Sequence, residues 1–146
     1  MKIQQCQPTS RVPVYTSQSH FLAKCIRRLE NAAKDFFAGE YDPGADELTL
    51  FWAQPDYEIF CDAAYACGFV CDDLSPDFPI DEANRRPLEL LGFEKFSGLR
   101  HYVHTLLRAE HSNRMDGCFS PVCTALQSGA LIVVAERLES DKSIYA

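Results

Sequence analysis

Residues 21–36 read FLAKCIRRLENAAKDF and place apolar side chains at every third or fourth position. Apolar residues at this spacing line one face of an α-helix, so the pattern predicts an amphipathic helix. Ser17 or Ser19 would cap its start, and Gly39 would end it. The predicted buried stripe consists of Phe21, Leu22, Cys25, Ile26, Leu29, Ala32, Ala33 and Phe36.

Four more helices are predicted from start and stop signals along the rest of the chain. Pro55 and Pro121 suit a first helical turn, and Ser120 suits the cap position before the second of these. Gly68 and Gly129 suit the residue that closes a helix. The apolar spacing Leu99, Tyr102, Val103, Leu106, Leu107 predicts the longest of the four. The predicted ranges are 55–67, 97–111, 121–128 and 130–138.

The fold class expected from these elements is mainly α, a compact bundle of about five helices. Residues 47–53, ELTLFWA, alternate in part and permit one short strand or hairpin. Residues 71–87 contain three prolines and are expected to form a loop. Residues 1–16 are expected to form an extended N-terminal arm of a single domain that spans residues 1–146.

Length and composition fit one soluble domain. The chain has 146 residues, 47% of them hydrophobic and 24% charged, which is ordinary for a globular protein. No apolar run reaches the roughly 18 residues that a membrane span needs, and the N-terminus lacks the apolar core of a secretory signal. The seven cysteines are odd in number, so reduced thiols are expected. We therefore expect a cytoplasmic protein with no membrane partner.

Charge is distributed unevenly along the sequence. Residues 35–84 contain thirteen Asp or Glu and no Lys or Arg, whereas the rest of the chain has eight acidic and fourteen basic residues. An acidic region repels nucleic acid and attracts a basic protein surface. Aromatic residues among clustered acids are typical of binding surfaces. The residues expected to contact a partner are Asp42, Asp46, Glu47, Trp52, Asp56, Tyr57, Asp72, Asp73, Asp77, Asp81 and Glu82.

A second group of residues has the side chains that bind zinc. His101 and His104 are three apart on a predicted helix and would present two nitrogen ligands on one face. Cys118 and Cys123 follow, although their spacing differs from that of zinc knuckles. Both histidines lie opposite the apolar stripe of their helix, so solvated surface histidines are the simpler interpretation. No catalytic residue and no cofactor are expected.

The chain also resembles a bacterial family known as a domain of unknown function, number 6508, over roughly residues 56–139. The resemblance rests on a helix that ends in Gly-Phe-Val, an amphipathic helix after Gly98 and Leu99, and a helix stop at 127–129. It implies a compact helical fold and supplies no catalytic residues. The turn at 113–117 is less basic here than in that family, so no shared ligand is implied. The matching segments are CDAAYACGFV (61–70), GLRHYVHTLLRAEH (98–111) and GCFSPVCTALQSGALIVVAERLE (117–139).

The sequence thus favours a non-catalytic, acidic protein-binding domain. Its partner would be a protein with a basic surface, such as a nucleic-acid-binding complex, which the acidic region would inhibit by mimicking nucleic acid. Anti-CRISPR proteins share this size and charge. The alternative is a zinc- or thiol-dependent enzyme centred on His101, His104, Cys118 and Cys123. Direct binding of nucleic acid is not expected, and the oligomeric state is left open.

Overall fold

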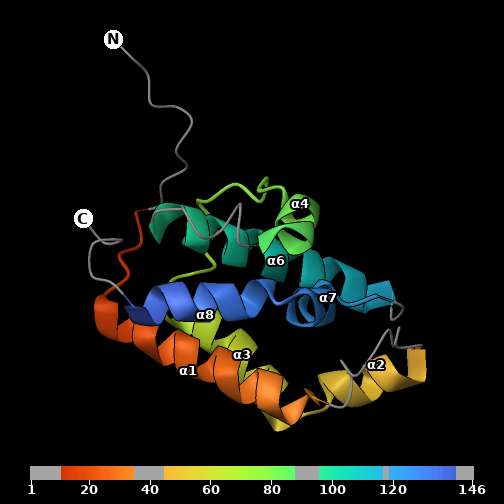
Figure 1. Cartoon of the computed structure of the whole chain (residues 1–146). Helices are drawn as coiled ribbons and strands as arrows, with labels where there is room; N and C mark the ends of the chain where they lie inside the picture. Colours follow the sequence, from red (N-terminus) through yellow and green to blue (C-terminus); the bar gives the residue numbers. More distant parts are fainter. Residues whose placement is uncertain (1–10, 35–44, 88–95, 117–118, 141–146) are drawn as a thin grey trace.

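The structure, a computed structural model, describes residues 11–34, 45–87, 96–116 and 119–140 (Figure 1). These residues form seven helices and no strand. The mainly helical fold predicted from the sequence is therefore confirmed. The helices are α1 (Thr16–Ala32), α2 (Ala45–Trp52), α3 (Pro55–Ala66), α4 (Ile80–Arg85), α6 (Phe96–Asp116), α7 (Pro121–Ser128) and α8 (Ala130–Ser140).

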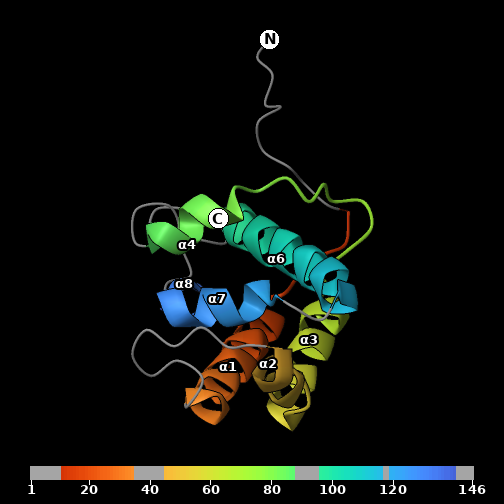
Figure 2. The ribbon, with the colours of Figure 1, turned by 90° about the vertical axis from the view of Figure 1, so that its right-hand side faces the viewer.

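The helices lie in three tiers. Helices α4 and α6 form one outer tier, α7 and α8 the middle, and α1, α2 and α3 the other outer tier (Figures 1 and 2). The most extensive packing joins α1 to α8 and α1 to α3, while α6 contacts α7. Helix α3 also reaches α6, where residues of the two helices line a shared pocket.

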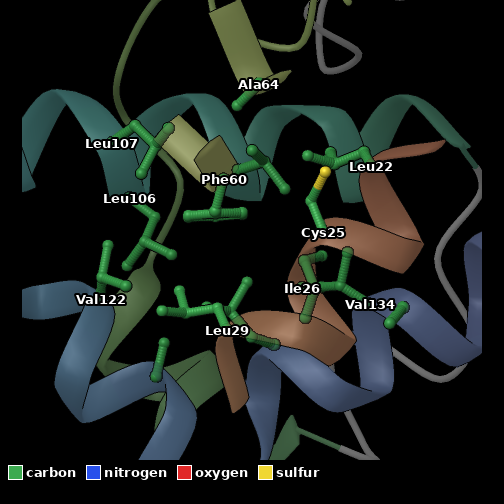
Figure 3. Close-up of a cluster of buried hydrophobic side chains, with 14 of the residues drawn as sticks. Leu22, Cys25, Ile26, Leu29, Phe60, Ala64, Leu106, Leu107, Val122 and Val134 are labelled. Atoms are coloured by element: carbon green, nitrogen blue, oxygen red, sulfur yellow. The ribbon is translucent and has the colours of Figure 1, made fainter. Parts of the chain in front are cut away.

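The hydrophobic core fills the space between these tiers. Figure 3 shows side chains from α1, α3, α6, α7 and α8 converging on it. Leu22, Ile26 and Leu29 of the predicted α1 stripe are fully buried there, whereas the predicted burial of Phe21 is wrong, because this residue is 51% exposed. Burial of each such side chain contributes about 1.5–3 kcal/mol, so this contact between distant parts of the chain holds the tiers together. The labelled core residues are Leu22, Cys25, Ile26, Leu29, Phe60, Ala64, Leu106, Leu107, Val122 and Val134.

The predicted caps of α3 and α7 are confirmed, whereas the cap predicted for α1 is wrong, because Tyr15 holds the N-cap position and Ser17 and Ser19 lie within the helix. Pro55 occupies the first turn of α3, and Gly68 follows the helix with φ 86°. The Ser120 hydroxyl accepts the backbone N–H of Cys123 at 3.1 Å, and Pro121 begins α7. Gly129 ends α7 in the left-handed region with φ 87°. These signals are local, so the sequence is sufficient to place both helices.

The strand expected at 47–53 is wrong, because residues 45–52 form α2. Leu48 and Phe51 are buried on one face of this helix. Their spacing of three, continued by Trp52, suits a helix, whereas the partial alternation of ELTLFWA suggests a strand. The loop expected at 71–87 is also wrong in part, since α4 begins after Pro79, which lies at its cap position.

Residues 11–15 precede α1 without regular structure, as expected of an arm, but they pack against the domain. A Cβ placed on Gly68 would lie 3.1 Å from a methyl of Val12 and 3.2 Å from one of Val14. Glycine at position 68 thus provides the space that these valines fill.

Within the described residues, no helix is long and apolar enough to cross a membrane.

Candidate protein-binding surface

Residues 71–79, here called the acidic loop, cross the face of α6 opposite its apolar stripe. Three backbone groups of the loop are bound by side chains of α6. The N–H of Cys71 donates to His104 Nδ1 at 3.3 Å, and the N–H of Phe78 donates to Thr105 Oγ1 at 3.2 Å. His101 Nε2 lies 2.8 Å from the carbonyl oxygen of Ser75. The loop is thus held at its start, middle and end.

The expectation that His101 and His104 are solvated is wrong, because the acidic loop covers both. His101 is 6% exposed and His104 is 0% exposed. Helical periodicity places them on the outer face of α6, which is correct, but it carries no information on what packs there. The Phe78 ring meets the His101 ring edge to face, with centroids 5.4 Å apart. Both histidines therefore serve to position the loop.

The tautomer of each histidine follows from its partners. Both groups near His101 Nε2, the Ser75 carbonyl and Asp77 Oδ1 at 2.7 Å, accept hydrogen bonds, so Nε2 carries the proton. His104 Nδ1 accepts the Cys71 N–H, so the neutral ring carries its proton on Nε2. Burial, with the charge of Arg108, lowers the pKa of His104, which favours this neutral form.

Arg100 fastens the same region to the N-terminal arm. Its guanidinium is buried and donates to the carbonyl of Gly68 at 2.6 and 2.9 Å and to the carbonyl of Val12 at 2.7 Å. The backbone N–H of Arg11 in turn donates to Asp73 Oδ2 at 2.9 Å. This basic residue of α6 thus has a structural role.

Four of the predicted partner-binding acids are exposed on or beside the acidic loop. Asp72, Asp73 and Asp77 belong to the loop, and Asp81 lies in the first turn of α4. Asp72 has a distant contact with Arg108, at 3.7 Å. Exposed ion pairs of this length contribute little to stability, so the Asp72 carboxylate stays available to a partner.

Other acids of residues 35–84 are paired with basic residues. Glu82 forms ion pairs with Arg85, at 2.6 Å, and with Arg86, and these hydrogen bonds lower its pKa. Asp56 lies 3.3 Å from Arg28 of α1. Charge is thus less separated in space than along the sequence, and the exposed acids described between residues 48 and 87 lie on the acidic loop, on α3 and in the first turn of α4.

Tyr57 and Trp52 belong to a buried cluster around Glu110. Tyr57 is 2% exposed, so it lies in the core and is not the exposed aromatic side chain expected from the sequence. Its hydroxyl donates to Glu110 Oε2 at 2.7 Å, and the indole N–H of Trp52 donates to the same oxygen at 2.9 Å. The guanidinium of Arg114 stands over both rings, 5.7 Å from the Trp52 centroid and 5.3 Å from that of Tyr57.

A surface pocket of about 100 Å³ adjoins this cluster, between α3 and α6. Burial raises the pKa of the Cys61 thiol in its wall to about 12, so the thiol is neutral at physiological pH. A neutral thiol is a weak nucleophile, and this gives no support to thiol chemistry in the pocket. The lining residues are Tyr57, Cys61, Tyr65, Leu107, Glu110, His111 and Arg114.

The residues of the zinc alternative are not brought together where the structure describes them. Cys118 lies outside the described residues, and Cys123 is buried on α7. Across the described parts of the chain, no three His, Cys, Asp or Glu side chains converge as metal ligands would.

Of the predicted partner-binding acids, Asp42 also lies outside the described residues, and only the backbones of Asp46 and Glu47 are described, within α2.

Sequence reasoning missed three residues of this region. Glu58 and Asp62 are exposed on α3, and neither forms an ion pair with a described residue. Glu110 is buried, although acidic residues are seldom buried. A signal for Glu110 was present, because it continues the stripe Val103, Leu106, Leu107 at helical spacing. A carboxylate on a buried stripe requires several donors, and this predicts a polar cluster.

Comparison with protein-family models, with curated proteins and with solved structures gave no significant match. The resemblance to the domain of unknown function therefore stays a prediction.

Proposed function

We propose that this chain is a non-catalytic protein-binding domain that docks its acidic loop and α3 onto a basic surface of a partner. The main support is the anchoring of the loop by His101, His104 and Thr105. Exposed loops are usually mobile, and ordering them on binding costs conformational entropy. A loop already held in place avoids much of that cost, so its carboxylates are preorganised for binding.

The sign of the charge indicates the partner. Asp72, Asp73, Asp77 and Asp81 would meet lysine and arginine side chains of the kind that contact nucleic acid phosphates. Association would be fast and sensitive to salt, since exposed charges steer the encounter and salt screens them. In this proposal the protein acts in the cytoplasm as an inhibitor of a nucleic-acid-binding complex, as anti-CRISPR proteins do, by occupying the surface that the nucleic acid needs.

A pair of charge-reversal variants tests this function. Asp72→Lys with Asp81→Lys changes two exposed acids of the proposed surface. Glu30→Lys with Glu136→Lys makes the same change in net charge near Arg27, on α1 and α8. The tagged protein and both variants are used to capture proteins from a bacterial lysate at low and at physiological salt. Capture of a nucleic-acid-binding complex that is lost in the first variant and kept in the second would support the proposal. Equal capture by all three would contradict it.

A further inference from the structure

The pocket between α3 and α6 offers a ligand mostly neutral surface. Leu107 and the rings of Tyr57 and Tyr65 form its apolar walls, and the Cys61 thiol is uncharged. Both carboxylate oxygens of Glu110 already accept hydrogen bonds, from Trp52, Tyr57, Ser120 and Val122. The carboxylate at its base is therefore satisfied within the protein. Arg114, the other charged residue of the lining, stands over the Tyr57 ring, and the remaining walls suit an apolar group.

The size of the pocket limits that group to one side chain. A buried apolar cavity on the order of 150 Å³ holds one benzene molecule. A pocket of about 100 Å³ therefore takes a smaller group, of the size of a leucine or isoleucine side chain. A side chain that fills a desolvated pocket contributes strongly to the binding free energy of a protein interface.

Acidic residues border the pocket along α3. Glu58 and Asp62 directly follow the pocket residues Tyr57 and Cys61, so they lie about 100° around the helix from them. Both are exposed, and neither forms an ion pair with a described residue. Tyr65, which lines the pocket, is itself 50% exposed. The α3 side of the pocket thus combines available carboxylates with an accessible aromatic ring.

The pocket and the acidic loop lie on adjoining faces of α6. Arg108, which contacts Asp72 of the loop, lies one turn before the pocket residue His111. A single partner surface can therefore reach both. We infer that the pocket receives one aliphatic side chain of the bound partner, from a segment with lysine or arginine beside that side chain to contact Glu58 and Asp62. This inference rests on the proposed function and identifies the partner side chain that anchors the complex.

Three short peptides test the inference with the full-length protein. The probes are acetyl-Arg-Arg-Leu-Gly-Gly-amide, the same peptide with alanine for leucine, and the same peptide with two glutamates for the arginines. Binding is followed by NMR, through the methyl signals of Leu107 and the ring signals of Tyr65. We expect the leucine peptide to shift these signals and to bind roughly ten-fold more tightly than the alanine peptide, because more apolar surface is buried. The glutamate peptide is expected to bind at least several-fold more weakly.

Two variants connect this binding to the pocket. Cys61→Leu places an aliphatic group in the pocket, and Tyr65→Ala removes one of its walls. Each should abolish the preference for leucine over alanine. Phe21→Ala is the matched control, because Phe21 is 51% exposed on α1 and does not line the pocket, and this variant should keep the preference.

The outcomes separate this inference from the proposed function. Equal binding of the leucine and alanine peptides, both weakened by Asp72→Lys with Asp81→Lys, would overturn the pocket as an anchor and leave the acidic docking surface in place. Equal binding of the arginine and glutamate peptides would overturn the basic segment and make the pocket a site for small apolar molecules. Absence of any shift at Leu107 and Tyr65 would also overturn it.

Discussion

The indole N–H of Trp52 donates to Glu110 Oε2 at 2.9 Å, which joins α2 to α6 across 58 residues of sequence. The same carboxylate accepts the hydroxyls of Tyr57 and Ser120 and the backbone N–H of Val122. Helices α2, α3 and α7 are thus tied to one buried side chain of α6. Every partner donates, which suits a carboxylate because it only accepts. This cluster also forms the base of the pocket between α3 and α6.

Replacement of Glu110 by glutamine should destabilise the protein by about 2–4 kcal/mol. The amide keeps the size of the side chain, but its NH₂ group would face donors and leave at least one of them unpaired. Urea unfolding followed by circular dichroism measures this change. Glu136→Gln, on the exposed side of α8, should alter the free energy of unfolding by less than about 0.5 kcal/mol. Similar values for the two variants would show that the cluster contributes little.

The buried His104 should make the protein less stable in acid. Burial and the charges of Arg108, His101 and Arg100 lower its pKa in the folded state below the ordinary value of 6.5. The unfolded chain therefore takes up the proton first as pH falls, and stability decreases below about pH 6.5 and is fully present above it. A difference of one in pKa between the folded and unfolded states corresponds to about 1.4 kcal/mol.

The variant His104→Asn separates this effect from other titrations, because the Asn Oδ1 atom takes about the position of His104 Nδ1. Its amide oxygen can accept the Cys71 N–H without titrating. Between about pH 7.5 and about pH 5.5, the wild type should lose more unfolding free energy than the variant. Urea unfolding at both pH values measures the difference. Parallel losses in the two proteins would rule out His104 as the source.

The two described glycines with positive φ should respond differently to alanine. At Gly129, φ is 87° and an added Cβ would meet no packed atom within 4 Å, so Gly129→Ala should cost about 1 kcal/mol from backbone strain alone. At Gly68, φ is 86°, and the Cβ would also meet Val12, Val14 and the Pro13 carbonyl at 3.1–3.3 Å. Gly68→Ala should therefore lower the free energy of unfolding by about 1 kcal/mol more than Gly129→Ala does. Thermal unfolding compares them, and equal effects would mean that the arm does not pack on Gly68.

The Cys61 thiol should resist alkylation in the folded protein. Burial raises its pKa to about 12, and only the thiolate reacts. At about pH 8, we expect Cys61 to react with iodoacetamide roughly a hundred-fold more slowly in the native protein than in urea, as measured by peptide mass spectrometry. Alkylation at the unfolded rate would contradict both the burial of this thiol and its raised pKa.

Much of the helical fold was predictable because its signals are local. Pro55, Ser120 and Gly129 act within one turn of their own positions, and the structure uses each of them as expected. Helix α2 was not predictable in this way. Over only eight residues, an apolar spacing of three, which indicates a helix, cannot be distinguished from partial alternation, which indicates a strand. The helix is decided by the burial of Leu48 and Phe51 against the rest of the fold, which the local sequence does not reveal.

The candidate surface was less predictable, since it depends on contacts between distant segments. Periodicity placed His101 on the outer face of α6 but could not reveal that the acidic loop covers it. A count of charges along the sequence could not reveal that Asp56 pairs with Arg28, because Arg28 belongs to another helix. Glu110 was the exception, because its place on an apolar stripe was visible in the sequence.

The most direct measurement is the dissociation constant of the captured partner, determined by titration at several salt concentrations with the wild type and the two charge-reversal variants. We predict that affinity falls steadily with salt, that Asp72→Lys with Asp81→Lys weakens it about ten-fold or more, and that Glu30→Lys with Glu136→Lys leaves it nearly unchanged. Nucleic acid should compete with the protein for the partner. A dissociation constant that is indifferent to salt, to the loop variant and to nucleic acid would contradict docking through the acidic loop.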